Sequence, residues 1–196
     1  MTRRIFMLFL LTIAIVLTAC SGNADKDNSN KKDTTDKEET ATQQDKDAQK
    51  VQVDLNNGED ESVGTATLTQ DSDGVEITLE GENLPKGTHA FHIHEKGQCE
   101  APAFESAGGH FNPDDTKHGF DASDGPHAGD MPNIEVGEDG TVKQSFLVKN
   151  VTLKKGEKNS LLRNDGTSLV IHEGADDGKS QPAGDAGDRL ACGPIK

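Results

Sequence analysis

The sequence has little of several features that would place it in a common class of proteins. Its 196 residues include no Trp, no Tyr and only three Cys, and 20 basic residues face 35 acidic ones. The formal net charge of −15 makes the chain a poor candidate for binding nucleic acid or an anionic membrane surface. Its one long apolar run is shorter than the roughly 20 residues that a membrane-spanning helix needs.

That apolar run belongs to a segment with the pattern of a bacterial export signal. Arg3 and Arg4 form a positive region, and residues 5–17 form the apolar region behind it. The tetrapeptide "LTAC", which ends at Cys20, resembles the lipobox of bacterial lipoproteins and implies cleavage before Cys20 with a diacylglyceryl group on its sulfur. We therefore expect residues 1–19 to be a lipoprotein signal peptide and the protein to be extracytoplasmic, lipid-anchored to the bacterial cell membrane. The alternative is an uncleaved N-terminal anchor on the same side.

The next segment lacks the side chains that form a core. Residues 21–50 contain no aromatic residue and no Val, Ile, Leu or Met, so they cannot bury enough apolar surface to offset the entropy of ordering. We predict that residues 20–50 are the lipidated Cys and a disordered polar linker, whose ends lie roughly 30 Å apart as a flexible coil. The charges of the signal and the linker cancel, so residues 51–196 carry the whole charge of −15.

Residues 51–196 show a different pattern, which we interpret as one folded domain. The segment "GVEITLEG" at 74–81 alternates apolar and polar residues, and "VGTATLTQ", "TVKQSFLV" and "SLVIHE" are similarly rich in strand-forming residues. No segment shows a convincing helical pattern. These features predict an all-β, antiparallel sandwich or barrel. Turn-forming pairs separate the segments: Asn57-Gly58, Asp73-Gly74, Asp139-Gly140 and Asp165-Gly166.

Two long stretches lack strand character, at about 95–132 and about 173–188, and such loops in a compact domain are usually functional. Cys99 opens the first stretch, and Cys192 lies near the end of the chain. With Cys20 lipidated, an exported protein would have an even number of cysteines left, which favours a Cys99–Cys192 disulfide over two free thiols.

The stretch "AFHIHEKG" at 90–97 contains two histidines that would share one face of a strand, His92 and His94. Alone, the pair could be a solvated surface strand or half of a metal site. Five further histidines and an aspartate decide between these readings, because glycine-rich loops can bring them together and imidazole with carboxylate suits zinc or copper. They are His89, His110, His118, His127, His172 and Asp130.

Six motifs occur in an order that resembles copper/zinc superoxide dismutase of the bacterial lipoprotein type, from about Val51 to Ile195. They are "FHIH", "AGGHFNP", "KHG", "HAGD", "VIHE" and "GDAGDRLACG". The resemblance implies a Greek-key, immunoglobulin-like β-sandwich or barrel in which two long loops form the metal site. It also implies an enzyme that converts superoxide to dioxygen and hydrogen peroxide.

The same resemblance implies a role for each site residue. It gives one copper ion per subunit, held by His92, His94, His110 and His172. It gives one zinc ion per subunit, held by His110, His118, His127 and Asp130. His110 would bridge the two metals and carry a proton in catalysis, and Arg189 would draw superoxide toward copper. Asp176 would hydrogen-bond a copper histidine, His94, and a zinc histidine, His118. Cys99 and Cys192 match the disulfide of the family, and His89 matches no ligand.

The chain departs from the family pattern in two places. Ala90 stands where glycine is usual, and the loop after His172 is short, with Lys179 as its only lysine. The partners implied are superoxide and, through Cys20, a membrane; the protein could be a homodimer or a monomer. The rival hypothesis is a non-catalytic dismutase-like module that binds or delivers copper. Such a module would be expected to lack a copper ligand or the arginine, and this sequence lacks neither.

Overall fold

The fold is known from a computed structural model that describes residues 49–196. The predicted signal peptide, the lipidated Cys20 and nearly all of the linker lie outside the described residues. The first strand begins at Lys50, the last residue of the predicted linker. Among the described residues, no helix has the length and apolarity to cross a membrane.

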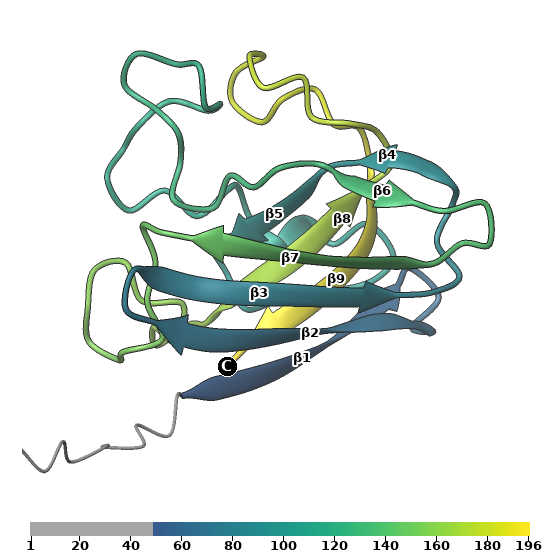
Figure 1. The fold of residues 1–196 in the computed structure, drawn as a ribbon, viewed down its shortest axis with the longest axis horizontal. Helices are drawn as coiled ribbons and strands as arrows, with labels where there is room; N and C mark the ends of the chain where they lie inside the picture. Colours follow the sequence, from purple (N-terminus) through teal and green to yellow (C-terminus); the bar gives the residue numbers. More distant parts are fainter. Residues whose placement is uncertain (1–48) are drawn as a thin grey trace, which may run out of the picture. The chain divides into compact units, whose positions relative to one another are not determined.

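Antiparallel strands form almost all of the regular structure of this part of the chain (Figure 1). Seven of them make one curled sheet in the order β5-β8-β9-β1-β2-β3-β7, and β4 pairs with β6 as a separate ribbon. The strands are β1 (Lys50–Asn57), β2 (Ser62–Asp71), β3 (Gly74–Gly81), β4 (Gly87–His89), β5 (Phe91–His94), β6 (Ile134–Val136), β7 (Val142–Val148), β8 (Thr167–His172) and β9 (Arg189–Ile195).

Alternation of apolar and polar residues explains why the sheet closes around one core. In β3, the side chains of Val75, Ile77 and Leu79 are buried, whereas Glu76 and Glu80 face solvent. The four segments predicted as strands correspond to β2, β3, β7 and β8, so those predictions are confirmed. Strand β8 is buried over its whole length, which means that loops cover the face that points away from the core.

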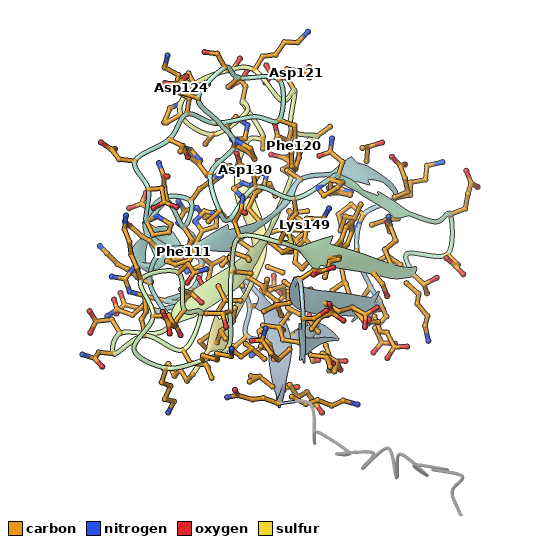
Figure 2. The ribbon with its side chains drawn as sticks, turned by 60° about the vertical axis from the view of Figure 1, so that its left-hand side comes forward. Phe111, Phe120, Asp121, Asp124, Asp130 and Lys149 are labelled. Atoms are coloured by element: carbon orange, nitrogen blue, oxygen red, sulfur yellow. A yellow bond between two sulfur atoms is a disulfide. The ribbon has the colours of Figure 1, made fainter. Side chains whose placement is uncertain are left out.

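The two predicted loops are confirmed, and they lie at the same edge of the sheet (Figure 1). The first loop spans residues 95–133 and contains only a single-turn 3-10 helix, Glu105–Ala107. The second loop spans residues 173–188. Figure 2 shows Phe120, Asp121 and Asp124 at the end of the first loop that is remote from the sheet, and Asp130 nearer to the sheet.

A disulfide joins the first loop to the last strand, as predicted. Cys99 is bonded to Cys192 across 93 residues of sequence, with their Cα atoms 5.6 Å apart. Phe104, Ala107 and Val170 pack against Cys192 and form a small second core between the loop and β8. A closed loop of this length stabilises the fold by about 4–5 kcal/mol in the chain-entropy model. The bridge therefore fixes the start of the first loop over the outer face of the sheet.

Candidate metal centre

Strand β5 sends its two kinds of side chain in opposite directions. Phe91 and Ile93 are fully buried in the main core. His92 and His94 point to the other face, where they lie opposite Val170 and Ser168 of β8. The first loop then returns beside β5, with backbone hydrogen bonds from Ile93 to Gly129 (2.9 Å) and from Phe111 to Ile93 (2.8 Å). The loops therefore cover both histidines, which are buried and not solvated.

One group of four histidines brings its ring nitrogens within 4.8 Å of one another: His92, His94, His110 and His172. The second nitrogen of each strand histidine is engaged elsewhere, which fixes the nitrogen that faces the group. His92 Nε2 contacts Asp176 (2.8 Å), and His94 Nδ1 contacts the carbonyl of Gly108 (2.9 Å). His94 Nε2 lies 3.3 Å from His172 Nε2. These are the residues predicted to hold copper.

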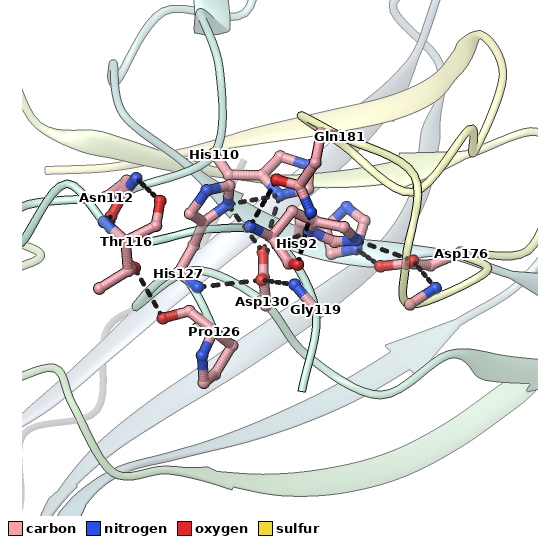
Figure 3. A network of polar contacts seen from close by, with 12 residues as sticks. His92, His110, Asn112, Thr116, Gly119, Pro126, His127, Asp130, Asp176 and Gln181 are labelled. Carbon is pink, nitrogen blue, oxygen red and sulfur yellow. Dashed lines mark hydrogen bonds and ion pairs between the residues drawn. The ribbon is translucent and has the colours of Figure 1, made fainter. Parts of the chain in front are cut away.

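The second group is centred on Asp130, whose Oδ1 atom lies 2.8, 3.1 and 3.2 Å from the Nδ1 atoms of His110, His118 and His127 (Figure 3). The other carboxylate oxygen accepts backbone hydrogen bonds from Gly119 (2.9 Å) and His127 (3.0 Å), so Oδ1 is left for a metal. Ligands at zinc distances in a tetrahedron would lie about 3.3 Å apart. The spacing therefore fits the predicted zinc site.

His110 belongs to both groups. Its Nδ1 faces Asp130, and its Nε2 is buried with no hydrogen-bond partner among the described residues. His92 Nδ1 and His118 Nδ1 are buried without a hydrogen bond in the same way. Such ring nitrogens are costly unless something coordinates them. Because they point into the two groups, the residues present fit one copper and one zinc joined through His110.

Comparison with known proteins agrees with this geometry. A family model described as copper/zinc superoxide dismutase matches residues 62–195, which is more than half of the chain. The chain belongs to the copper/zinc superoxide dismutase family. It is 54% identical over 148 residues to the Aquifex aeolicus protein named superoxide dismutase Cu-Zn 1, covering 75% of this chain and 88% of that relative.

Solved structures agree on the fold. The chain matches a superoxide dismutase-like protein from Bacillus subtilis with a TM-score of 0.71 and 44% identity, over 74% of this chain and 97% of that one. It matches the copper/zinc superoxide dismutase from Brucella abortus with a TM-score of 0.62 and 27% identity, over 76% and 100% of the two chains. The predicted all-β Greek-key fold is therefore confirmed. The copper and zinc sites of this dismutase are the two groups described above.

Burial sets the protonation of the metal ligands in this dismutase. Burial lowers the pKa of His110 to about 4 and that of His172 to about 3, and it holds the pKa of His94 well below its ordinary value. These three rings are therefore neutral near pH 7, which is the form that binds metal. Burial also opposes charge on His118, but its hydrogen bond to Asp176 and the charge of Asp130 outweigh it and raise the pKa of His118.

Asp176 joins the two sites, although one of its partners differs from the prediction. Its Oδ2 contacts His92 Nε2 (2.8 Å) and its Oδ1 contacts His118 Nε2 (3.0 Å). The predicted contact with His94 is wrong, because the Nδ1 atom of His94 is already engaged by the carbonyl of Gly108. Burial raises the pKa of the Asp176 carboxyl, but the hydrogen bonds from His92 and from the backbone of Gly178 outweigh this and lower it overall.

Arg189 begins β9 and lies opposite His172 of β8. Its guanidinium donates hydrogen bonds to the carbonyls of Phe104 and Gly108, the latter at 2.6 Å. Burial lowers the pKa of Arg189, but the group remains a cation near pH 7. A surface cavity of about 470 Å³ opens beside it, and two acidic residues, Glu105 and Asp188, line that cavity with Arg189. The sequence did not predict that Glu105 lies near Arg189, because Glu105 belongs to none of the recognisable motifs.

The remaining histidine lies outside both groups. His89 is buried, and its ring nitrogens contact the carbonyls of His172 (2.9 Å) and Pro85 (2.8 Å), which agrees with the predicted structural role. Ala90, where glycine was expected, is also buried. Its backbone donates to Gly174 (2.8 Å) and accepts from His172 (2.9 Å). Residues 89 and 90 therefore tie the copper strand to the start of the second loop.

Proposed function

We propose that this dismutase protects the outer side of a bacterial membrane, with Arg189 binding superoxide, His110 moving a proton and Cys20 carrying a lipid anchor. The observation that carries the proposal is the complete pair of ligand groups that meet at His110. When bound, copper supplies one-electron chemistry and zinc supplies a fixed positive charge, since zinc has no redox chemistry of its own.

Arg189 supports substrate binding by its charge and its position. Superoxide is a small anion, and a guanidinium offers a permanent positive charge with several N–H donors. Two donors of Arg189 are engaged with Phe104 and Gly108, which holds the side chain in one orientation. Arg189 is the strand partner of His172, a copper ligand, and it lines the surface cavity. It can therefore bind the anion next to the copper group without being a ligand itself.

His110 is positioned to hold and release a proton. Its Nδ1 atom faces the zinc group and Asp130, so proton exchange falls to Nε2, which faces the copper group. Two superoxide ions and two protons yield one dioxygen and one hydrogen peroxide. A proton held at Nε2 can be delivered to the second superoxide at the point where peroxide forms, and water supplies the other proton.

Location outside the cytoplasm is supported by the Cys99–Cys192 disulfide, because such bonds persist in oxidising compartments. The lipid anchor rests on the "LTAC" tetrapeptide at Cys20. Metabolic labelling with a radioactive fatty acid tests it: the wild-type protein should be labelled and sediment with membranes, and Cys20→Ser should be unlabelled. An unlabelled wild-type protein would remove the anchor. The proposal covers either a monomer or a homodimer, which sedimentation velocity separates.

The rival function, a dismutase-like module without turnover, has a relative in its favour. A Bacillus subtilis protein that is 44% identical over 145 residues is named superoxide dismutase-like protein YojM. This chain, however, has all six metal-binding histidines, Asp130 and Arg189 in place. An activity assay on copper- and zinc-loaded protein decides. We expect turnover in the wild type and none in His172→Ala, with zinc still bound; an inactive wild type with full copper would establish the rival.

A further inference from the structure

The backbone of one zinc ligand is held by a side chain from the other loop. The amide N–H of His118 donates to Gln181 Oε1 (3.0 Å), and Gln181 Nε2 donates to the carbonyl of His118 (2.9 Å; Figure 3). Gln181 Nε2 also lies 3.2 Å from the carbonyl of Lys179 in its own loop. One glutamine thus satisfies both backbone polar groups of a residue that lies 63 positions earlier in the chain.

A second side-chain amide, that of Asn133 in the first loop, binds the backbone of a residue in the second loop in the same way. The amide N–H of Asp176 donates to Asn133 Oδ1 (2.9 Å), and Asn133 Nδ2 donates to the carbonyl of Asp176 (3.0 Å). Asn133 ends the first loop, whereas Asp176 belongs to the second. Each loop therefore contributes one amide that binds the backbone of a metal-site residue in the other loop.

Two glycines show how closely the loops approach each other. A methyl group on Gly184 would lie 2.0 Å from Asp176 Oδ1 and 2.8 Å from His118 Nε2. A methyl group on Gly119 would lie 2.1 Å from the carbonyl of Gly178. Both glycines have a positive φ, of 74° and 97°, which side chains rarely adopt. The second loop thus packs directly against the first loop, here called the zinc loop because it carries all four zinc ligands. Neither contact leaves room for a side chain.

We propose that Gln181 and Asn133 are positioning residues that couple retention of zinc to the seating of the second loop. The Nε2 atom of His118 is held by Asp176, and its backbone by Gln181, so its Nδ1 atom stays directed at the zinc group. Asp176 in turn is held by Asn133 and also contacts the copper ligand His92. Loss of the Gln181 contact removes the first hydrogen bonds of this series, which hold the backbone of His118, and zinc then leaves faster.

The test is the rate of zinc transfer from the loaded full-length protein to a coloured chelator. Outer hydrogen-bond partners of metal ligands typically affect metal affinity by 10–100-fold, so we expect Gln181→Ala to release zinc about tenfold faster or more. The absorption spectrum of Co²⁺ in the zinc site should broaden in the same variant. Gln181→Glu keeps the size but opposes the His118 carbonyl with a negative charge. We expect Gln181→Glu to release zinc faster as well, and it replaces Gln181→Ala as the test if the alanine variant does not fold.

Gln70 is a matched control at another place in the sheet. Its Oε1 accepts from the Leu153 N–H (2.7 Å) and the Thr152 hydroxyl (2.9 Å), and its Nε2 donates to the carbonyl of Gly74 (2.7 Å). None of these partners is a metal ligand. Gln70→Ala should lower the unfolding temperature but leave zinc release unchanged.

Equal zinc release from the Gln70 and Gln181 variants would overturn the inference, as would an unchanged rate in both Gln181 variants. The inference rests on the zinc site and not on turnover. Zinc release and the Co²⁺ spectrum are measured without superoxide, so an inactive enzyme would contradict the proposed function and leave this result standing.

Discussion

The two metal groups are built from different parts of the fold. Three copper ligands, His92, His94 and His172, lie on the paired strands β5 and β8. All four zinc ligands lie within residues 110–130 of a single loop. The sheet therefore forms most of the copper site by itself, whereas the zinc site exists only when the loop is folded back. We therefore expect that copper can be lost alone, whereas loss of zinc also disturbs His110 and with it the copper site.

The largest effect on the difference between the two metal sites is expected from removing Asp130, the centre of the zinc group. Asp130→Ala deletes the oxygen that faces His110, His118 and His127 and the one that binds two backbone amides. We expect zinc to be lost almost completely and activity to fall with it, with a drop in unfolding temperature of several degrees. Metal analysis and calorimetry on the same sample check this. Full zinc content in the variant would contradict the assignment.

Removal of a copper ligand from the sheet should be more local. In His172→Ala we expect the activity to vanish while zinc content and unfolding temperature stay near the wild-type values, because the zinc loop keeps all its ligands. Metal analysis of copper and zinc, paired with a dismutase assay, separates the two sites. A variant that keeps most of the wild-type rate would show that the copper assignment is wrong.

In the metal-free protein, histidines with lowered and with raised pKa values should lose their stabilising contributions in opposite pH directions. The pKa of His110 is lowered to about 4 and that of His172 to about 3, so the stability that depends on neutral rings is present above pH 6.5 and is lost as the pH falls toward those values. The pKa of His118 is raised, so its contribution is present below pH 6.5 and lost as the pH rises through its folded value.

Because the pKa of His94 is lowered as well and the contribution of His118 changes mainly above pH 6.5, metal-free protein should lose on the order of 5 kcal/mol of unfolding free energy between about pH 6.5 and 4. Urea unfolding at a series of pH values measures this loss. His172→Gln removes one titrating ring and should therefore make the unfolding free energy depend less steeply on pH. An equal slope in the variant and the parent would assign the acid sensitivity to other groups.

Arg189 should affect rate without affecting either metal group. Arg189→Ala removes the cation beside His172 but no ligand, so we expect turnover to fall roughly tenfold or more with copper and zinc retained. Turnover and copper content are measured on one sample. Loss of copper in step with activity would instead give Arg189 a role in holding the site together.

The smallest expected effect concerns charge around the copper side. The metals and Arg189 are positive, whereas distant carboxylates of this acidic domain are screened beyond about 8 Å at physiological salt. We expect the rate constant to fall as salt rises from about 10 to about 200 mM, measured by pulse radiolysis. Glu105→Gln should raise the rate about twofold at low salt, and Glu157→Gln, away from the copper side, should not. A rate that rises with salt would mean that the acidic surface dominates.

Much of the site could be predicted from the sequence, because residue types at short spacings carry it. The alternation in "FHIH" puts two histidines on one face, and glycine-rich motifs mark the loop ligands His110 and His127. What could not be predicted are contacts between loops, such as those of Gln181 and Asn133, since the path of an aperiodic loop has no signature. The misassigned partner of Asp176 has the same origin. Strands β4 and β6, with three residues each, are too short for a pattern to reveal.

The carbonyl of Gly108 accepts from both His94 Nδ1 and Arg189 Nη2. One oxygen atom therefore positions both a copper ligand and the cation that we propose binds superoxide. If the segment around Gly108 shifts, we expect both donors to follow the shared acceptor. Their separation then varies less than the position of either one. A shared acceptor should therefore keep the distance between superoxide at Arg189 and copper at His94 nearly constant when the loop moves.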